Sequence, residues 1–361
     1  MGAHMSFSDT KLNLSKKGYT ATREVVNFLN TVYETAAFKK HDYERVIEAG
    51  EKLIKKTPDY FLDYEIPDGI GTEVFGMQFP SRVILSSFKG DIGVIEQYMK
   101  LGLGGATIKT VMPEYRDGNK RPRIKIDEDG IRNRMGLPGP GMYKVVKELV
   151  CSDIFAFDRP VGISIGGETV EEYFGVFSTM RLIEDMPFGG KKPVVYYEIN
   201  ASCPNTGKMQ LCEDDLMFKE VLSKLRESGK DAKIFVKLSP SLENEKILER
   251  ADICQEYGMG LTLGNTRKDI FGENPDKPGE MLPCGKSGPT LKERTIDVVK
   301  LARNHGYSLP IIAIGGLSNA ADVMEAINAG ADLAGMATAV VKNHYDAIVQ
   351  TNLDLAQMLN K

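Results

Sequence analysis

The chain has 361 residues, of which 42% are apolar and 27% are charged, a composition typical of a globular protein with a large core. Its formal net charge is −4, and charges of both signs are mixed along it, which excludes the basic surface that binds nucleic acid. No apolar run approaches the roughly 20 residues that cross a bilayer, and no signal peptide opens the chain. We therefore expect a cytoplasmic protein without stable membrane insertion.

The cysteine and histidine content argues against a metal site. The five cysteines include no C-x-x-C pair, and their odd number also argues against a disulfide framework, structural zinc and iron–sulfur clusters. Only four histidines are present, and two of them precede residue 42. We expect no metal, so catalysis would require another kind of cofactor.

The first part of the chain differs from the rest. Residues 1–4 read Met-Gly-Ala-His and resemble the remnant of an expression tag. Apolar side chains then recur at helical spacing over residues 25–37 and again over 43–54, which predicts two amphipathic helices in an N-terminal extension covering residues 5–70. Two roles stay open: packing on the main domain or a partner subunit, or a role at a membrane surface or in quinone access.

From about residue 74 onward, short apolar runs alternate with helical patterns. Eight runs are rich in β-branched residues, at 83–85, 106–108, 161–165, 194–199, 234–238, 260–263, 311–314 and 332–336. Each run is apolar at nearly every position, which indicates a parallel sheet buried on both faces. Helical patterns follow the runs, at 91–101, 141–150, 168–184, 214–228, 243–257, 290–304, 319–329 and 340–358.

Eight such strand–helix units predict an α/β fold, a (β/α)8 TIM barrel with insertions over residues 71–361. A doubly wound open sheet is the alternative. That fold would favour a glycine-rich fingerprint after the first strand, where residues 86–90 read SSFKG instead. In a barrel, active-site residues lie just beyond the C-terminal ends of the strands, so we expect the site at those positions.

Two glycine-containing turns, after the seventh and eighth strands, suit an anion. Gly315 and Gly316 let backbone amides approach a ligand closely, and the turn through Thr338 adds further donors and a hydroxyl. TIM barrels commonly bind phosphate at this place. A tight turn without a ligand is the alternative for the Gly-Gly pair alone, and the second turn favours a phosphate site.

Four asparagines lie at predicted strand ends or in the loops beyond them: Asn133, Asn200, Asn205 and Asn265. A primary amide offers both a donor and an acceptor, so several of them suit a flat ring with alternating C=O and N–H groups, such as a pyrimidine. A single asparagine is more simply a turn former, but four together favour a binding site.

Lys237 and Cys203 carry the candidate chemistry. Lys237 would place an ammonium in the barrel mouth, which is costly without a negative partner. This lysine could stabilise negative charge on a cofactor or, as in class I aldolases, form an imine in a lyase. Cys203 follows the fourth strand in a polar, proline-containing turn, where a thiol is a candidate base or nucleophile.

Seven segments resemble the dihydroorotate dehydrogenase family. NASCPNTGKMQ at residues 200–210 resembles the family's Asn-x-Ser-Cys-Pro-Asn loop, and six further segments follow the family's order: KTVMPEYRDGNKRPR, NRMGLPGPG, VKLSP, GNT, CGKSGP and the stretch from IIAIGGL to DVMEAINAGADLAGMATA. The resemblance covers about residues 72–345. It implies a TIM barrel that holds FMN at its C-terminal mouth and an FMN-dependent oxidoreductase that converts dihydroorotate to orotate in pyrimidine biosynthesis.

The resemblance also implies roles for individual residues. Cys203 matches the base that removes the C5 proton of the substrate while hydride passes from C6 to flavin N5, and Lys109 matches a lysine that contacts both flavin and substrate. Substrate binding is expected at Lys109, Asn133, Met135, Gly136, Leu137, Asn200, Asn205, Asn265 and Thr266. Cofactor binding is expected at Ser86, Ser87, Lys109, Thr110, Asn200, Lys237, Gly288, Gly315, Gly316, Ala337 and Thr338.

The electron acceptor stays open at this point. A cysteine base is the class 1 pattern, whereas Arg134 after Asn133 and the N-terminal helical extension resemble class 2 enzymes, which are membrane-associated and reduce quinone. A related flavin enzyme acting on another dihydropyrimidine, such as dihydrouracil, is the near alternative, since dihydropyrimidine dehydrogenases share the Ser-Cys-Pro loop and an Asn-Thr pair. A homodimer is expected from the family resemblance alone.

Overall fold

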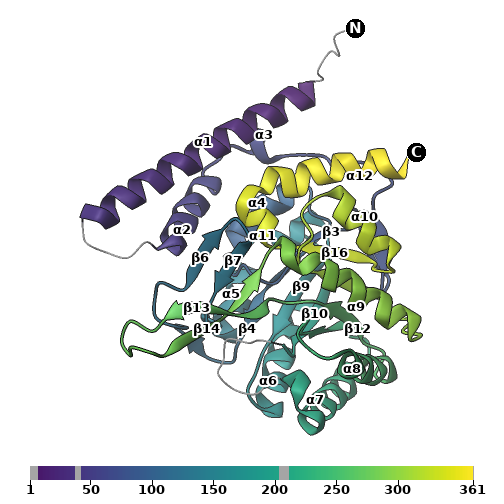
Figure 1. Ribbon diagram of the computed structural model, residues 1–361. Helices are drawn as coiled ribbons and strands as arrows, with labels where there is room; N and C mark the ends of the chain where they lie inside the picture. Colours follow the sequence, from purple (N-terminus) through teal and green to yellow (C-terminus); the bar gives the residue numbers. More distant parts are fainter. Residues whose placement is uncertain (1–6, 37–41, 203–210, 361) are drawn as a thin grey trace.

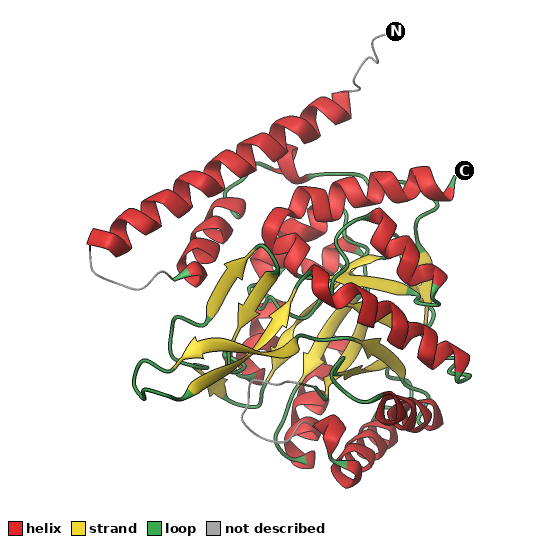
Figure 2. Cartoon of the chain, viewed as in Figure 1, coloured by secondary structure: helices red, strands yellow, loops and turns green. Residues whose placement is uncertain are grey.

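The computed structural model describes residues 7–36, 42–202 and 211–360. Residues 1–4, Cys203 and Asn205 lie outside the described residues, so what the sequence predicts for them stays a prediction. The described part consists of a central set of strands with helices around it (Figure 2).

A closed barrel of eight parallel strands forms the centre of the molecule (Figure 1). The strands are β3 (Val83–Leu85), β4 (Gly105–Val111), β9 (Val161–Ile165), β10 (Val195–Asn200), β11 (Ile234–Leu238), β12 (Gly260–Leu263), β15 (Ile311–Ile314) and β16 (Leu333–Met336). The pairing of β16 with β3, which sets Ala334 opposite Val83, closes the cylinder. The predicted (β/α)8 fold is therefore confirmed, and each predicted run forms a barrel strand.

Helices cover the outside of the barrel. They are α4 (Ile92–Lys100), α5 (Met142–Val150), α6 (Val170–Arg181), α7 (Asp215–Ser228), α8 (Asn244–Glu256), α9 (Lys292–Asn304), α10 (Ala320–Asn328), α11 (Thr338–His344) and α12 (Thr351–Leu359). Polar caps explain where several begin, because the side chains of Asp91, Thr169, Asp214 and Asn319 each accept a hydrogen bond from a backbone N–H of the first turn. The last predicted helix is interrupted, since Asn343 leaves helical geometry and a π-helical segment follows at Tyr345–Gln350.

Apolar side chains close the N-terminal end of the barrel. The hairpin of β1 (Thr72–Val74) and β2 (Met77–Phe79) contributes to a cluster that also contains Tyr196 and Phe235 from the starts of β10 and β11. A neighbouring glycine makes room for these rings, because a Cβ on Gly162 would lie 2.4 Å from the Tyr196 ring. With that end filled, a ligand reaches the interior from the C-terminal mouth.

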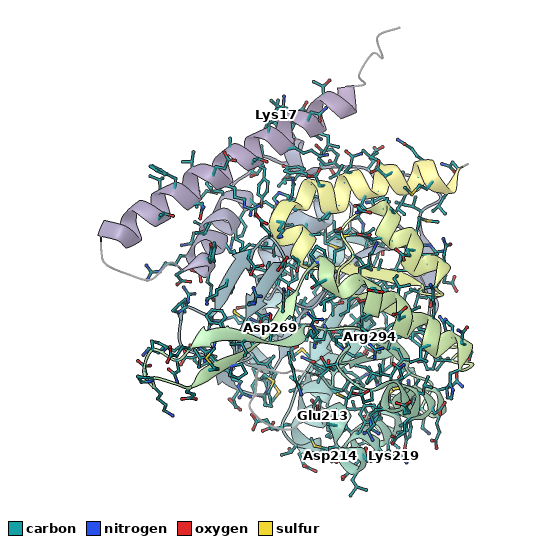
Figure 3. The ribbon with its side chains drawn as sticks, viewed as in Figure 1. Lys17, Glu213, Asp214, Lys219, Asp269 and Arg294 are labelled. Atoms are coloured by element: carbon teal, nitrogen blue, oxygen red, sulfur yellow. The ribbon has the colours of Figure 1, made fainter. Side chains whose placement is uncertain are left out.

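The segments after barrel strands β4 and β12 form a four-stranded antiparallel sheet. Its strand order is β13 (Arg267–Glu273), β14 (Met281–Ser287), β7 (Gly130–Asn133) and β6 (Ile124–Asp127). Asp269 on β13, labelled in Figure 3, accepts a hydrogen bond of 3.0 Å from Arg132 on β7. Two shorter strands, β5 (Tyr115–Arg116) and β8 (Gly139–Pro140), pair antiparallel and join the two ends of the segment that contains β6 and β7. None of these strands was predicted from the sequence.

The N-terminal extension forms α1 (Phe7–Ala36), α2 (Tyr43–Ile54) and the short α3 (Asp59–Leu62). Figure 1 shows α1 along the outer edge of the molecule, with α2 between it and the barrel. The first half of α1 is anchored to the C-terminal segment, where Lys16 Nζ donates to Gln350 Oε1 at 2.8 Å. The extension therefore packs on the barrel in this region, as one of the two open roles predicts.

The second half of α1 exposes apolar side chains. Val25, Phe28 and Leu29 are 57%, 66% and 58% exposed, so this part of the predicted amphipathic face is not covered by the barrel. Within the described ranges, no helix combines the length and the hydropathy that crossing a membrane requires.

Candidate active site

A cavity of about 880 Å³ lies at the C-terminal mouth of the barrel. This volume falls within the roughly 300–1,000 Å³ that small-molecule sites occupy. With one exception, the described residues predicted to bind substrate or cofactor line this cavity. The lining residues are Ser86, Ser87, Lys109, Thr110, Asn133, Met135, Leu137, Asn200, Lys237, Asn265, Thr266, Gly288, Gly315, Gly316, Ala337 and Thr338. The exception is Gly136, which lies between two wall residues without being part of the wall.

Lys237 on β11 is buried, and its ammonium has two polar partners at the cavity wall. Nζ donates to Ser87 Oγ at 2.9 Å and forms an ion pair with Glu198 Oε1 at 3.5 Å. Ser87 in turn donates to the same Glu198 oxygen at 2.6 Å. Glu198 is thus the negative partner that a buried ammonium requires. An amine held as an ion pair is a poor nucleophile, which weighs against the imine-forming alternative.

Asn200, at the end of β10, is held from two sides. Its Nδ2 donates to Thr110 Oγ1 at 2.8 Å, and Thr110 shares a hydrogen bond of 3.1 Å with Ser164 Oγ. The Tyr173 hydroxyl donates to the backbone carbonyl of Asn200 at 3.0 Å. These contacts fix the orientation of the amide before any ligand arrives, as a preorganised site requires.

Asn265, just beyond β12, reaches across to the segment that follows β10. Its Nδ2 donates to Ser202 Oγ at 2.9 Å and to the Ser202 carbonyl at 3.0 Å. Its Oδ1 accepts a hydrogen bond of 2.8 Å from the backbone of Thr266. Ser202 is buried and is the last described residue before Cys203. The backbone that enters the predicted catalytic loop is therefore anchored to β12.

Glycines in the turn after β15 and inside β16 leave no room for a side chain. Gly315 and Gly316 have φ of +113° and +79°, which favour glycine, and a Cβ on Gly316 would lie 2.3 Å from the Lys292 nitrogen. A Cβ on Gly335 would lie 2.8 Å from Ser86 Oγ. That hydroxyl is buried and has no hydrogen-bond partner among the described residues. Buried polar atoms are normally paired, so the unpaired hydroxyl indicates a ligand contact.

Lys109 lies on β4 and forms part of the same wall as the loop after β7. The backbone N–H of Lys109 donates to the Lys89 carbonyl at 2.8 Å, which ties β4 to the turn after β3. Leu137 in the loop after β7 has φ of +54°, a left-handed conformation that is strained for leucine. Such strain is common where a loop contacts a ligand.

The family model described as dihydroorotate dehydrogenase matches residues 70–359. The chain belongs to this family. Three curated relatives are similar. The catalytic subunit of dihydroorotate dehydrogenase B (NAD⁺) from Staphylococcus carnosus is 32% identical over 67% of this chain and 76% of that protein. Dihydroorotate dehydrogenase (quinone) from Thermus thermophilus is 27% identical over 79% of this chain and 82% of that protein. Dihydroorotate dehydrogenase A (fumarate) from Lactobacillus helveticus is 31% identical over 71% of this chain and 80% of that protein.

A solved dihydroorotate dehydrogenase shares the fold. The crystal structure of the Eimeria tenella protein in complex with ferulenol superposes with a TM-score of 0.72 and covers 88% of this chain and 93% of that chain, at 22% sequence identity. The members of this family are flavin-dependent oxidoreductases, and the chain is therefore an oxidoreductase. The names of the three curated relatives give three different electron acceptors: NAD⁺, quinone and fumarate.

Several polar residues at or beside the site were not predicted from the sequence of this dihydroorotate dehydrogenase homologue. One of them, Glu198, carried a signal: it is a carboxylate inside the otherwise apolar run 194–199, one strand before that of Lys237. Two others, Glu44 and Glu51 on α2, carried none, because acidic residues on an amphipathic helix look like its solvated face. Only the fold shows that α2 turns these side chains toward the barrel mouth.

A second cavity, of about 930 Å³, lies between the extension and the barrel and is lined mainly by apolar and aromatic side chains. His344 on its wall is buried, and burial lowers the pKa of its imidazole to about 3, so the ring is neutral at physiological pH. The ring centroid of Tyr19 lies 4.2 Å from that of His344. The two cavities are neighbours, because they share four wall residues: Ile47, Glu51, Val341 and Lys342.

Proposed function

We propose that the chain oxidises dihydroorotate to orotate with FMN bound at the barrel mouth, a step of pyrimidine biosynthesis. One observation carries the proposal: the substrate residues predicted on β4, β7, β10 and β12 and the cofactor residues predicted on β3, β11, β15 and β16 surround one cavity. The proposal includes the division into an extension (5–70) and an FMN-binding barrel (71–361). It also includes a cytoplasmic location and a homodimer, for the reasons given with the sequence.

The residues at the mouth fit FMN. The turns at Gly315 and Gly316 and at Ala337 and Thr338 suit its phosphate, because all four residues line the cavity and backbone N–H groups in such turns bind anions. The unpaired Ser86 hydroxyl beside these turns supports a polar ligand at this end of the cavity. When bound, FMN supplies the acceptor for the hydride from C6 of the substrate.

The chain's own residues would bind, orient and deprotonate the substrate. Asn133, Asn200, Asn205 and Asn265 would hold the pyrimidine ring, and Lys109 with the backbone of residues 135–137 would receive its carboxylate. Cys203 would remove the C5 proton as general base. Lys237 would place its positive charge where negative charge develops during the reaction. The anchoring of Ser202 by Asn265 supports a defined path of the backbone into the catalytic loop.

The purified protein is expected to be yellow, and anaerobic dihydroorotate should bleach its flavin absorbance. Dihydrouracil should not bleach the flavin absorbance, because it lacks the carboxylate that Lys109 and residues 135–137 are proposed to bind. Bleaching by dihydrouracil alone would assign the related dihydropyrimidine enzyme instead. A protein that stays colourless after FMN is added would reject the proposal, and borohydride trapping of substrate on Lys237 would then support the lyase.

For the electron acceptor, we propose a quinone that reaches the flavin through the second cavity. The relatives' names give NAD⁺, quinone and fumarate. A cavity lined mainly by apolar and aromatic side chains, with the neutral His344 on its wall, suits an uncharged ring such as that of a quinone. The wall residues that both cavities share support a short path between acceptor and flavin.

Filling the second cavity should block the acceptor and leave the substrate reaction intact. Gly50 on α2 lines this cavity, and an added Cβ there meets no atom within 4 Å, so Gly50→Leu would place its side chain in open space. We expect reoxidation of the reduced protein by decylubiquinone to slow about tenfold or more, which is about 1.4 kcal/mol, with no change in flavin reduction by dihydroorotate. Stopped-flow absorbance measures both steps.

The matched control is Gly175→Leu on α6, which also has open space around its Cβ and lies on neither cavity wall. It should reoxidise at the rate of the unaltered protein. Equal reoxidation rates for the Gly50 and Gly175 variants, or faster reoxidation by fumarate than by decylubiquinone, would contradict the proposed acceptor.

A further inference from the structure

The extension is joined to the barrel by a buried ion pair. Glu44 on α2 receives two hydrogen bonds of 2.8 Å from Nε and Nη2 of Arg123, a residue of the insertion after β4. The two side chains are only 9% and 10% exposed. Asp42 caps the first turn of α2 by accepting from the Glu44 backbone at 3.1 Å. The bidentate geometry fixes the position of the guanidinium relative to the helix.

Arg123 uses its remaining donor nitrogen to hold a turn. Nη1 donates to the Asp117 carbonyl at 2.6 Å and to the Asn119 carbonyl at 3.2 Å. Gly118, between these residues, has φ of +76°, and a Cβ on it would lie 2.2 Å from the Met135 carbonyl. The turn is therefore pressed against the loop that follows β7, with no space for either to shift toward the other.

Asn119 connects the 117–119 turn to the loop after β7 by hydrogen bonds. Its Nδ2 donates to the Arg134 carbonyl at 2.7 Å, and its backbone N–H donates to the Met135 carbonyl at 2.9 Å. The Arg134 N–H in turn donates to the Arg123 carbonyl at 2.9 Å. Gly136 also packs against Asn119. It has φ of +74°, and a Cβ on it would lie only 2.9 Å from the Asn119 backbone nitrogen.

We propose that Glu44 is a positioning residue for substrate binding: through Arg123 and Asn119, α2 holds residues 134–137 in the geometry that receives the substrate. The inference rests on the proposed function, which assigns the substrate carboxylate to this loop. Glu44 borders the cavity, but its carboxylate is already bound by Arg123 and lies 3.2 Å from Arg121. A direct contact between it and the substrate carboxylate would be repulsive, so Glu44 acts through its arginine partner.

Loss of the Glu44 charge should weaken substrate binding selectively. Glu44→Gln keeps the side-chain size but cannot pair with the guanidinium as a carboxylate does, so the 117–119 turn and the loop above it lose their support. We expect the Kd for orotate and the KM for dihydroorotate to rise about 10- to 100-fold, since small displacements of a positioning group cost factors of this size. FMN affinity and the rate of flavin reduction at saturating dihydroorotate should stay within about twofold.

The experiment titrates the FMN-loaded protein with orotate and follows the change in flavin absorbance, which reports binding without turnover. Glu48→Gln is the matched control, because Glu48 lies one turn further along α2, pairs with Arg121 and is 46% exposed. Its orotate Kd should equal that of the unaltered protein. Glu44→Asp restores the charge and should recover part of the affinity that Glu44→Gln loses.

The outcomes separate this inference from the proposed function. If the unaltered protein loads FMN but orotate causes no spectral change, the proposed function fails. If it binds orotate and Glu44→Gln binds it as tightly as Glu48→Gln does, the positioning role is wrong, even where the melting temperature falls. Should Glu44→Gln fail to fold, Arg123→Lys replaces it, since lysine keeps the charge but loses the two-pronged contact. An orotate Kd unchanged in that variant would equally overturn the inference.

Discussion

Replacing Cys203 with alanine is expected to slow the reduction of bound FMN by dihydroorotate about 10²- to 10⁴-fold, because loss of a general base typically costs this much. The affinity for FMN should not change, since all the predicted cofactor residues except Asn200 lie on other strands and turns. Anaerobic stopped-flow measurement of flavin bleaching gives the rate, and titration of the protein with FMN gives the affinity.

The control for this variant is Cys151→Ala, which removes an exposed thiol beyond the end of α5, outside the wall of the active-site cavity. Its flavin should be reduced at the rate of the unaltered protein. If the Cys203 variant is reduced as fast as the Cys151 variant, another group removes the C5 proton. If it also fails to bind FMN, the loop has a structural role that the proposed mechanism omits.

The barrel was predictable because its strands are buried on both faces. Runs such as Ile311–Ile314 and Ile234–Leu238 carry apolar side chains at almost every position, and their spacing along the chain leaves room for one helix between each pair. The same reasoning placed the site, since in a barrel the strand ends converge whatever the lengths of the loops. Residues as distant in the sequence as Lys109 and Thr338 therefore line one cavity.

The antiparallel sheet and the α2 contacts were not predictable in the same way. The sequence of β6, Ile-Lys-Ile-Asp, alternates between partly buried and exposed positions, and its charged residues hide a strand within a polar stretch. Strand β13 has a register shift between Ile270 and Gly272, which breaks the alternation. The pairing of Glu44 with Arg123 joins residues 79 positions apart, and no local pattern marks either of them as a partner.

Replacing Lys237 with methionine should destabilise the protein by about 3–5 kcal/mol, the usual cost of removing one member of a buried ion pair. Glu198 would keep the hydrogen bond from Ser87 but would be left as a buried carboxylate without its cation. Urea denaturation of the FMN-free protein at pH 7 measures this loss. FMN should also bind about tenfold to hundredfold more weakly, because a charge-assisted contact of about 1.5–3 kcal/mol disappears.

The double variant Lys237→Met with Glu198→Leu distinguishes the two roles of the lysine. Because replacing both members of a buried pair with apolar residues is often close to neutral, most of the lost stability should return. FMN affinity should not return, since neither new side chain carries a positive charge toward the cofactor. A double variant that binds FMN like the unaltered protein and is reduced at its rate would show that Lys237 serves only to balance Glu198. Continued weak binding in a restored fold would instead assign the ammonium to the cofactor, with Glu198 and Ser87 holding it in place.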